Sequence, residues 1–480
     1  MAIYSNCILM TLLLFIPLVF SLFLKKKKML TEEYVCCTII MTGVMLRLTY
    51  ILYTGIVDRQ HDVHDFFSDN GGHAEYILYF FRYRSFPDFD PREIWQFYHP
   101  PLHHIICAVW LTILEFFGIP AKFDGVHTLP FLTVVYSSLF CLFACKTFKR
   151  LDFKSTTLYL CTAFVTFHPT LIILSGSVNN DMLSSLFGMM AVFYTVKWSQ
   201  DRKWYSIVMI ALSIGLGMFT KLSVGLLAPA VAVVFLVVLI KQRKEIKKLI
   251  PQFLVFAVIC LPLGLFWSVR NYVKFDVPLN YVPKLSDDSF QFIEKSGLER
   301  FTDWSLYQIS SPFVQWGGDT TYKEFNPIIA LLKNSMFDEG TFFDRSITLQ
   351  SFCTALFFVN IILVVFALVG LAVFLFKNKV QKIEIKLLLA VTGVVIFGNY
   401  CIFCVNYQHI CTQNMRYCVP LIFVGAASLG YFVDKFKESK KSILKKSVPF
   451  VKGMMTAFCS LSIFVYMAMM YYITYLSTIL

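Results

Sequence analysis

Long apolar runs, separated by short polar stretches, constrain this chain more than any other feature. A helix of about 20 apolar residues crosses the ~30 Å hydrocarbon core of a bilayer. The period-2 alternation that marks the strands of a membrane barrel does not occur. The sequence therefore predicts an all-α polytopic membrane protein with apolar helices at 5–24, 34–56, 101–118, 128–145, 156–174, 182–198, 204–220, 222–240, 251–269, 352–376, 386–405, 417–433 and 450–476.

The composition of the 480 residues agrees with this class. Hydrophobic residues make up 57% and charged residues only 15%, whereas a soluble domain averages about 25% charged residues. This excludes a cytosolic enzyme, a disordered chain and a secreted module held together by disulfides. We predict one integral membrane domain over residues 1–480.

The net charge of +13 comes from short basic blocks that lie between the apolar runs. Loops rich in Lys and Arg stay on the cytoplasmic side, so we interpret the charge as topology and expect no nucleic-acid partner. The first apolar run has its lysines after it, which predicts a retained anchor with its N-terminus outside. The blocks are 25–28, 146–154, 197–203, 241–248, 377–386 and 435–446.

One apolar run does not fit an alternating topology. If all basic blocks are inside, three runs lie between the outer loop that ends at Pro100 and the outer turn at Asp181, although the number of crossings there must be even. The run 101–118 is short, begins with two prolines and contains two histidines and a glutamate. We therefore predict that it does not span, which leaves twelve spans, about 12–13 helices in all, and both termini outside.

Two outer loops, 57–100 and 270–350, are larger than connectors need to be. The first has eight acids against four arginines, a net charge of −4, and holds six of the nine histidines if it is extended to His104. Within it, Ala74, Ile77, Leu78 and Phe81 recur at helical spacing. This predicts an amphipathic helix on the membrane surface.

Acids and histidines of the first loop are candidates for chemistry. Such side chains bind divalent metals or deprotonate a hydroxyl, although their spacing matches no zinc signature and solvated loops often collect them. We favour a functional role above all for Asp62, because it directly follows a membrane helix. The candidate residues for a metal or acceptor site are His61, His64, His73, Glu75 and His103.

Three segments of this loop resemble the GT-C superfamily of membrane glycosyltransferases, in particular the bacterial branch related to protein O-mannosyltransferases and lipid A aminoarabinose transferases. The segments are Gln60-His61-Asp62-Val63, Gly72-His73-Ala74-Glu75-Tyr76-Ile77 and Trp95 to Leu102. The resemblance implies a GT-C-like bundle with two large outer loops. It also implies that Asp62, or less favourably Asp58, is the catalytic base, and that His99-Pro100-Pro101-Leu102 contacts a lipid-linked donor.

Further matches extend down the chain, among them the turn that ends at Asp181, where the resemblance implies a second catalytic acid. Lys221, Arg270 and Arg416 lie at outer helix ends, where basic side chains are otherwise rare. A guanidinium fork suits phosphate oxygens. We therefore predict that His99, Lys221, Arg270 and Arg416 bind the donor phosphate, and that the two arginines meet in one outer pocket.

The combined expectation is a glycosyltransferase that moves a sugar from a polyprenyl-phosphate donor to a protein, lipid or glycan acceptor on the outer face, in contact with membrane lipids and with a divalent metal ion as a candidate cofactor. A bacterial plasma membrane is favoured over the endoplasmic reticulum. One alternative is a transporter with a metal- or proton-coupled site, although no internal repeat supports it. Another is a membrane metallohydrolase.

Overall fold

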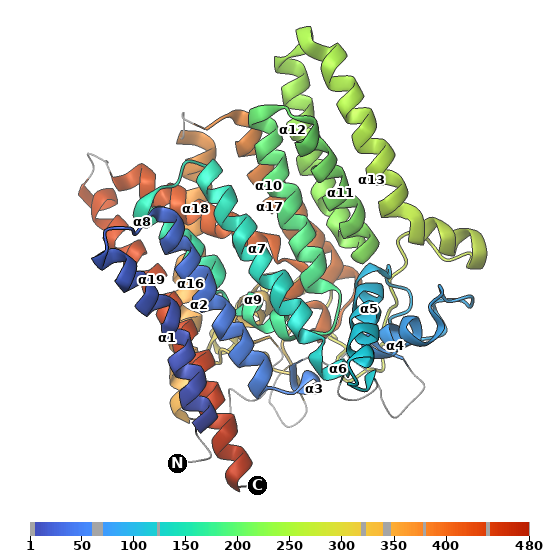
Figure 1. Cartoon of the computed structure of the whole chain (residues 1–480), viewed down its shortest axis with the longest axis horizontal. Coiled ribbons are helices and arrows are strands. Elements are labelled where there is room, and N and C mark those ends of the chain that lie inside the picture. The colour runs from blue at the N-terminus through green and yellow to red at the C-terminus, as the bar shows by residue number, and fades with distance from the viewer. Residues whose placement is uncertain are drawn as a thin grey trace.

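The computed structural model of the chain describes residues 5–59, 71–121, 125–317, 323–338, 347–377, 381–437 and 442–479. Within these residues the named elements are all helices, and strand pairing is limited to three isolated bridges. The long helices form one bundle, and α1 begins at the end of the bundle where α19 finishes (Figure 1). The predicted all-α architecture is confirmed.

Eight helices of the described residues are long and apolar enough to cross a membrane, and two bent helix pairs raise the number to ten. The eight are α1 (Ser5–Lys26), α2 (Glu32–Tyr53), α7 (Pro130–Arg150), α12 (Ala228–Lys241) with the preceding η4 (Leu222–Leu227), α13 (Ile246–Phe275), α16 (Ile347–Lys377), α17 (Ile383–Asn406) and α19 (Ser442–Ile479). The bent pairs are α8 (Ser155–Thr166) with α9 (Pro169–Ile173), and the turns η7 (Ile410–Thr412) and η8 (Met415–Tyr417) with α18 (Pro420–Lys437).

Two more helices complete the bundle. α10 (Asp181–Asp201) packs between α7 and α11 (Trp204–Thr220), and α11 packs on α13. Most of α10 is buried, so it faces protein and does not need the hydropathy of a lipid-facing helix. α11 has 17 residues, which is about 25 Å of helix. The described residues thus provide eight to ten candidate spans, and α10 and α11 pack beside them in the bundle.

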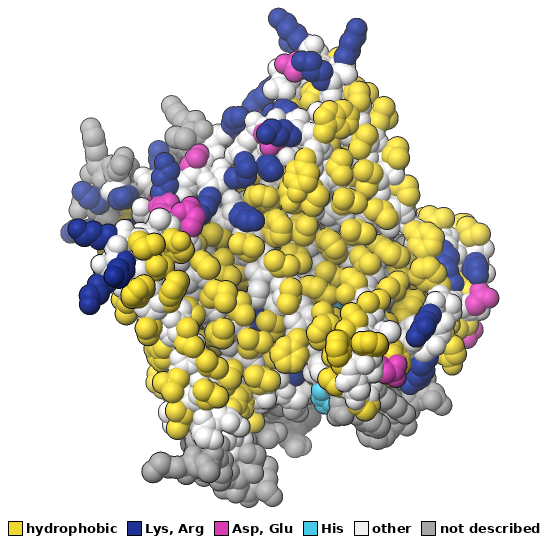
Figure 2. All heavy atoms as spheres, in the orientation of Figure 1, with side chains coloured by type: hydrophobic (Ala, Val, Ile, Leu, Met, Phe, Trp, Pro, Cys, Tyr) yellow, Lys and Arg dark blue, Asp and Glu magenta, His cyan; other side chains and the backbone are white. Residues whose placement is uncertain are grey.

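The basic blocks gather at one end of the bundle. Lys149 at the end of α7 pairs with Glu33 at the start of α2 across 2.8 Å, and Arg150 donates to Gln200 near the end of α10. Lys241 at the end of α12 pairs with Glu384 at the start of α17 across 2.7 Å. Figure 2 shows most of the visible Lys and Arg side chains gathered towards one end of the molecule, above a broad hydrophobic belt. This is the charge distribution of a membrane protein whose other end faces outward.

The opposite, outer end carries the short helices: α3 (Ile56–Arg59), α4 (His73–Tyr83), α5 (Leu102–Phe116), α6 (Val126–Thr128), α14 (Glu299–Thr302) and α15 (Pro327–Phe337). α5 has 15 residues, or about 22 Å, which is less than the ~30 Å core. The predicted apolar face of α4 exists, since Ala74, Ile77 and Leu78 are buried. This face packs on α5 and neighbouring residues rather than on lipid.

This arrangement predicts which positions a membrane-impermeant thiol reagent reaches from outside. In a background without the other accessible cysteines, the prediction that α5 does not cross requires His127→Cys and Ser310→Cys both to react in intact cells. Lys244→Cys, at the basic end, should react only after permeabilisation. All three positions are exposed. Reaction of the cysteine at position 127 only after permeabilisation would show that α5 spans.

Candidate active site

The first outer loop is folded back so that α4 begins beside the segment that leads into α5. The amide of Gly72 donates to the carbonyl of Trp95 over 3.0 Å. Gly71 has a φ of +91°, and a Cβ there would lie 2.7 Å from the carbonyl oxygen of Trp95. Only glycine tolerates both conditions, so this pair of glycines fixes where α4 starts.

Four histidines meet where α4 and α5 begin. His73 is the first residue of α4, His99 precedes the two prolines, and His103 and His104 lie in the first turn of α5. The ring of His73 stacks on that of His99 with 5.5 Å between centroids and on that of His104 with 5.3 Å. Nδ1 of His73 and Nε2 of His104 are 3.0 Å apart, so one ring donates to the other.

The hydrogen bonds fix the protonation of this cluster. Nε2 of His103 lies 2.9 Å from the carbonyl oxygen of Val178 and must donate to it. His73, His103 and His104 are almost completely buried, and Nδ1 of His104 has no hydrogen-bond partner. A second proton on any of these rings would place a charge where water does not reach it. The cluster is therefore a set of neutral imidazoles.

The electrostatics agree. Burial lowers the pKa of His103 from its usual value to about 4. Burial also holds the pKa of His73 well below its usual range, with His99, His103, Lys221 and Arg416 adding to the effect. The pKa of His99 is lowered by loss of solvent, then by Lys221, His104 and Arg416. These neighbours show that the two cations lie close enough to act on the imidazoles.

An ion pair forms the second part of the site. Asp181, the first residue of α10, is almost completely buried and binds Nζ of Lys221, which follows α11. The backbone of Asp181 is held in turn, because its amide donates to Oδ1 of Asn179 over 3.0 Å and its carbonyl accepts from Ser184 over 2.8 Å. The carboxylate therefore holds the ammonium group in a defined position.

Tyr417 joins this pair to a second cation. Nζ of Lys221 and Cζ of Arg416 each lie 5.2 Å from the centre of the Tyr417 ring. Both distances are within the range of cation–π attraction. The backbone turn that carries Arg416 is capped by Asn414, whose Oδ1 accepts from the amide of Arg416 over 2.9 Å and whose Nδ2 donates to Asp338 at the end of α15.

The second outer loop holds this turn in place. The buried guanidinium of Arg300 donates to the carbonyls of Phe325 and Cys404 and to Oε1 of Gln413, over 2.8, 2.7 and 2.9 Å. Gln413 also donates to the carbonyl of Glu324 over 3.0 Å. Arg300 therefore connects the outer loop, α17 and the segment that presents Arg416.

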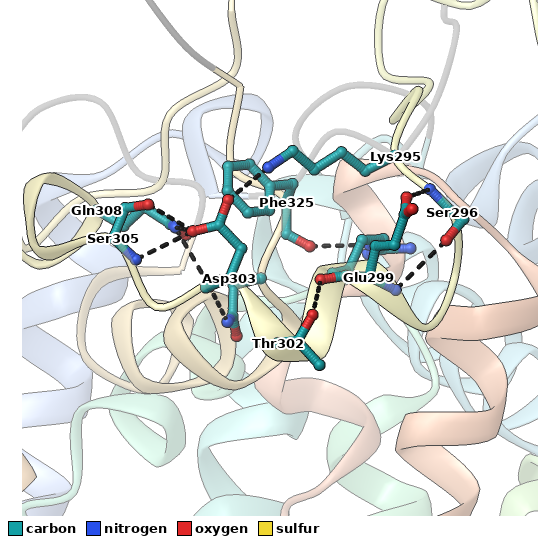
Figure 3. A network of polar contacts seen from close by, with 10 residues as sticks. Lys295, Ser296, Glu299, Thr302, Asp303, Ser305, Gln308 and Phe325 are labelled. Carbon is teal, nitrogen blue, oxygen red and sulfur yellow. Dashed lines mark hydrogen bonds and ion pairs between the residues drawn. The ribbon is translucent and has the colours of Figure 1, made fainter.

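Polar contacts around α14 keep Arg300 in position. Figure 3 shows Asp303 accepting from Lys295, Ser305 and Gln308, and Glu299 and Ser296 capping each other. Asn326 adds a bond of 2.7 Å to the carbonyl of Asp303. The residues around α14 are thus connected to the start of α15.

The structure brings six of the predicted site residues into one region. They are His73, His99, His103, Asp181, Lys221 and Arg416, linked by the ring contacts, the ion pair and the electrostatic effects described above. They come from α4, α5, α10, the end of α11 and the turn before α18. Whether each acts as predicted stays a prediction.

Two predicted residues have other neighbours. Glu75 pairs with Arg82 across 3.0 Å on the exposed side of α4. Arg270 donates to Asn271 and to the carbonyl of Pro87 and lies 4.8 Å from the ring of Trp267. Trp267 in turn donates to the carbonyl of Tyr98 over 3.1 Å, so Arg270 supports the segment that carries His99.

The remaining predicted residues, His61, Asp62 and His64, lie outside the described residues. Within the part of the chain that the structure describes, no group of three His, Cys, Asp or Glu side chains is arranged to hold a metal ion. The predicted divalent metal therefore has no complete ligand set among the described residues.

Several residues of the site were not singled out from the sequence. His104 follows His103 directly, and a pair of histidines after two prolines was a signal that could have found it. Tyr417 was seen only as part of a matching segment. No sequence pattern indicated the importance of Arg300, Gln413 or the pair Glu324–Lys333, because a sequence does not show that a polar loop residue becomes buried.

We predict that stability depends on pH through the histidines. Unfolded histidines titrate near about pH 6.5, whereas the folded pKa of His103 is about 4 and those of His73 and His104 are also depressed. Between these values the unfolded chain binds more protons, so stability is complete above pH 6.5 and is lost as the pH falls towards 4. Thermal unfolding of detergent-solubilised protein from pH 7.5 to 4.5 measures this loss, and His104→Asn should reduce its slope. The exposed His127→Gln is the control, and an equal reduction there would contradict the assignment.

We also predict a large effect at the ion pair between Lys333 and Glu324, whose side chains are fully buried and 2.6 Å apart. Lys333→Met leaves the carboxylate buried without its cation, which costs about 3–5 kcal/mol of unfolding free energy. The double variant with Glu324→Gln should recover most of this loss. Lys284→Met removes an exposed pair with Asp287 and should cost at most about 1 kcal/mol. Equal losses at the two lysines, measured by denaturant unfolding, would contradict the prediction.

Comparison with known proteins agrees with the fold. Residues 99–267 match the family described as dolichyl-phosphate-mannose-protein mannosyltransferase. No curated protein sequence matches the chain significantly. The crystal structure of ArnT from Cupriavidus metallidurans in the apo state is similar, with a TM-score of 0.50, 11% identity and coverage of 89% of this chain and 75% of that chain. The Archaeoglobus fulgidus oligosaccharyltransferase in complex with zinc and sulfate gives a TM-score of 0.47 at 14% identity, over 89% of this chain and 52% of that chain.

The matched segment begins at His99 and contains the histidines of α5, Asp181 and Lys221, so it covers most of the site. The similarity to ArnT extends over nearly the whole bundle and concerns the fold. On these grounds residues 99–267 are similar to the dolichyl-phosphate-mannose-protein mannosyltransferases, and the helical bundle has a fold like that of ArnT.

Proposed function

We propose that the protein is a glycosyltransferase of the GT-C type, which takes its sugar from a polyprenyl-phosphate donor and transfers it to an acceptor at the outer face of the membrane. The observation that carries the proposal is the arrangement of Lys221 and Arg416 around Tyr417, beside the neutral histidines, at the outer end of the bundle. Two cations and neutral hydrogen-bond donors at this level are complementary to a phosphate group at the boundary between lipid and water.

The leaving phosphate needs positive charge in the transition state. Arg416 and Lys221 are cations, and α4 and α5 both begin at the histidine cluster, so the partial positive charges of two helix N-termini add to their field. Neutral imidazoles donate hydrogen bonds without changing the charge. His99, which is only partly buried, is the histidine that we assign to the donor.

The acceptor hydroxyl must lose a proton as it attacks. Asp181 is paired with Lys221, so we assign it to holding that cation and assign the base to Asp62. The acceptor oxygen forms a bond to the anomeric carbon while the bond from that carbon to the phosphate oxygen breaks, which inverts the anomeric configuration. The proton goes to the carboxylate and the electron pair leaves with the lipid phosphate.

The acceptor class, a protein, lipid or glycan, belongs to the same proposal, as does a divalent metal with His61 and His64 among its predicted ligands. We propose a bacterial plasma membrane as the location, with the site facing away from the basic end. A transporter is not favoured, because the polar groups gather at one end and the matched family is a transferase family.

The proposal is tested by incubating purified protein with a panel of polyprenyl-phosphate sugars and measuring free lipid phosphate. We expect at least one donor to release free lipid phosphate, and more of it when an acceptor is present. If a divalent metal takes part, a chelator should reduce this release. Absence of release with every donor, together with release from a polyprenyl-diphosphate or nucleotide sugar, would contradict the donor class.

Two variants test the assigned roles. Asp62→Asn should reduce turnover by about 10²- to 10⁴-fold, the usual contribution of a general base, with little change in donor binding. Lys221→Met should instead raise the donor KM and lower turnover, since it removes the cation and leaves Asp181 buried without its partner. Lys284→Met is the matched control, because it is the same substitution at an exposed lysine of the outer loop. Normal turnover of Asp62→Asn would move the base to another acid.

A further inference from the structure

Arg59, the last residue of α3, lies buried between the end of α2 and the turn 174–180, which leads into α10. Its Nη1 donates to the carbonyl of Gly176 over 2.6 Å. Its Nε and Nη2 donate to the carbonyls of Gly55 and Thr54 over 3.0 and 2.8 Å. One guanidinium therefore joins the end of α2 to a turn that lies 117 positions further along the chain.

The turn approaches Arg59 very closely at Gly176. A Cβ at Gly176 would lie 2.6 Å from Cδ and 2.7 Å from Nη1 of Arg59, and 2.9 Å from Cε1 of Tyr50. The hydrogen bonds to the end of α2 restrain the guanidinium, and the ring of Tyr50 lies beside it, 6.0 Å from Cζ to the ring centre. Only glycine allows the backbone of the turn to come this near.

The same turn holds two parts of the candidate active site. The carbonyl of Val178 accepts from Nε2 of His103 over 2.9 Å. The side chain of Asn180 donates to the carbonyl of Thr220 over 2.8 Å, and Thr220 directly precedes Lys221. The place of the turn therefore affects both the histidine cluster and the cation of the ion pair.

We propose that Arg59 is a positioning residue of the site, which sets the places of His103 and Lys221 by holding the turn 174–180. A guanidinium suits this role, because its planar fork binds carbonyls of both segments at once, which an ammonium group does less well. The effect on sugar transfer rests on the function proposed above, whereas the effect on the geometry of the site does not.

The turn has a second attachment to the bundle. Thr133 of α7 donates to the carbonyl of Ser175 over 2.7 Å. Removal of the guanidinium therefore leaves the turn bound on one side, so we expect it to shift and not to unfold. A variant of Arg59 is then informative about the site.

The reactivity of Lys221 towards acetic anhydride tests the proposal without a donor. Its side chain is 15% exposed and paired with a carboxylate, so it should react slowly in the detergent-solubilised wild type. Arg59→Met should raise its acetylation, measured by peptide mass spectrometry, by about fivefold, the equilibrium effect of one lost hydrogen bond of ordinary strength. Arg82→Met, the same substitution at an exposed arginine of the first outer loop, should leave it unchanged.

A fully buried lysine separates a local shift from general loss of structure. Lys333 should stay unmodified in every variant, because its side chain is not exposed at all. Equal acetylation of Lys221 in the wild type and in Arg59→Met, an equal increase in Arg82→Met, or acetylation of Lys333 together with Lys221 overturns the proposal.

Two further variants cover the case in which Arg59→Met does not fold. Gly176→Ala keeps the guanidinium and pushes the turn away from it, so acetylation of Lys221 should rise. Arg59→Lys keeps the charge and binds fewer carbonyls, so its acetylation should lie between that of the wild type and that of Gly176→Ala. Unchanged acetylation of Lys221 in Gly176→Ala overturns the proposal.

Kinetics with a polyprenyl-phosphate sugar test the consequence for transfer. Arg59→Met should raise the donor KM, and adding it to Lys221→Met should cost little more than Lys221→Met alone, because both act through one cation. Strictly additive losses overturn the positioning role. If the wild type uses no such donor while acetylation of Lys221 responds as expected, the function proposed above fails and the positioning role of Arg59 stands.

Discussion

The buried guanidinium of Arg300 is the interaction on which the outer end of this protein depends. It binds three segments that are distant in sequence, through Phe325, Cys404 and Gln413. A planar group with five donors can satisfy three acceptors at once, which an ammonium group does less well. The turn that presents Arg416 and Tyr417 follows Gln413 directly, so the cationic part of the site is held by a residue that has no contact with the histidines among the described interactions.

The site also depends on breaks in two helix pairs, α8 with α9 and the turns η7 and η8 with α18. α8 and α9 are bent by 52° and the turns before α18 by 55°, and a proline begins the second helix of each pair, where its missing amide does no harm. Inside a membrane the freed carbonyls need partners. Ser462 donates to the carbonyl of Phe167 over 2.6 Å, and Ser137 donates to that of Leu171 over 2.7 Å. The breaks therefore cost little, and they direct residues 174–181 and 410–417 to the site.

The sequence was sufficient for the architecture because hydropathy and charge act over whole segments. The all-α bundle and its basic end follow from the length of apolar runs and from the side on which lysines gather, whereas the number of spans and the exclusion of 101–118 stay predictions. The same reasoning suggested that the helix around Ile77 lies on lipid, whereas it packs on α5, because periodicity shows that a face is apolar and not what covers it.

The site itself was only partly accessible to this reasoning. His73, His99, His103, Asp181, Lys221 and Arg416 were named separately, as acids, histidines and cations at outer helix ends, and the structure gathers them. Lys333 and Glu324 were not, because their importance comes from complete burial. A lysine in a polar loop has the same sequence signature whether it is solvated or buried, and the free energies of these two states differ by several kcal/mol.

The pairing of Asp181 with Lys221 has a consequence for the proposed reaction. The carboxylate compensates the ammonium group, which would otherwise be an unpaired cation beside buried imidazoles. A phosphate that enters competes with Asp181 for the same hydrogens, since charge-assisted bonds to phosphate and to carboxylate are of similar strength. Binding therefore exchanges one anionic partner of Lys221 for another, and the net gain must come from Arg416 and the helix N-termini. This makes Arg416, rather than Lys221, the residue on which the affinity for the donor should depend most.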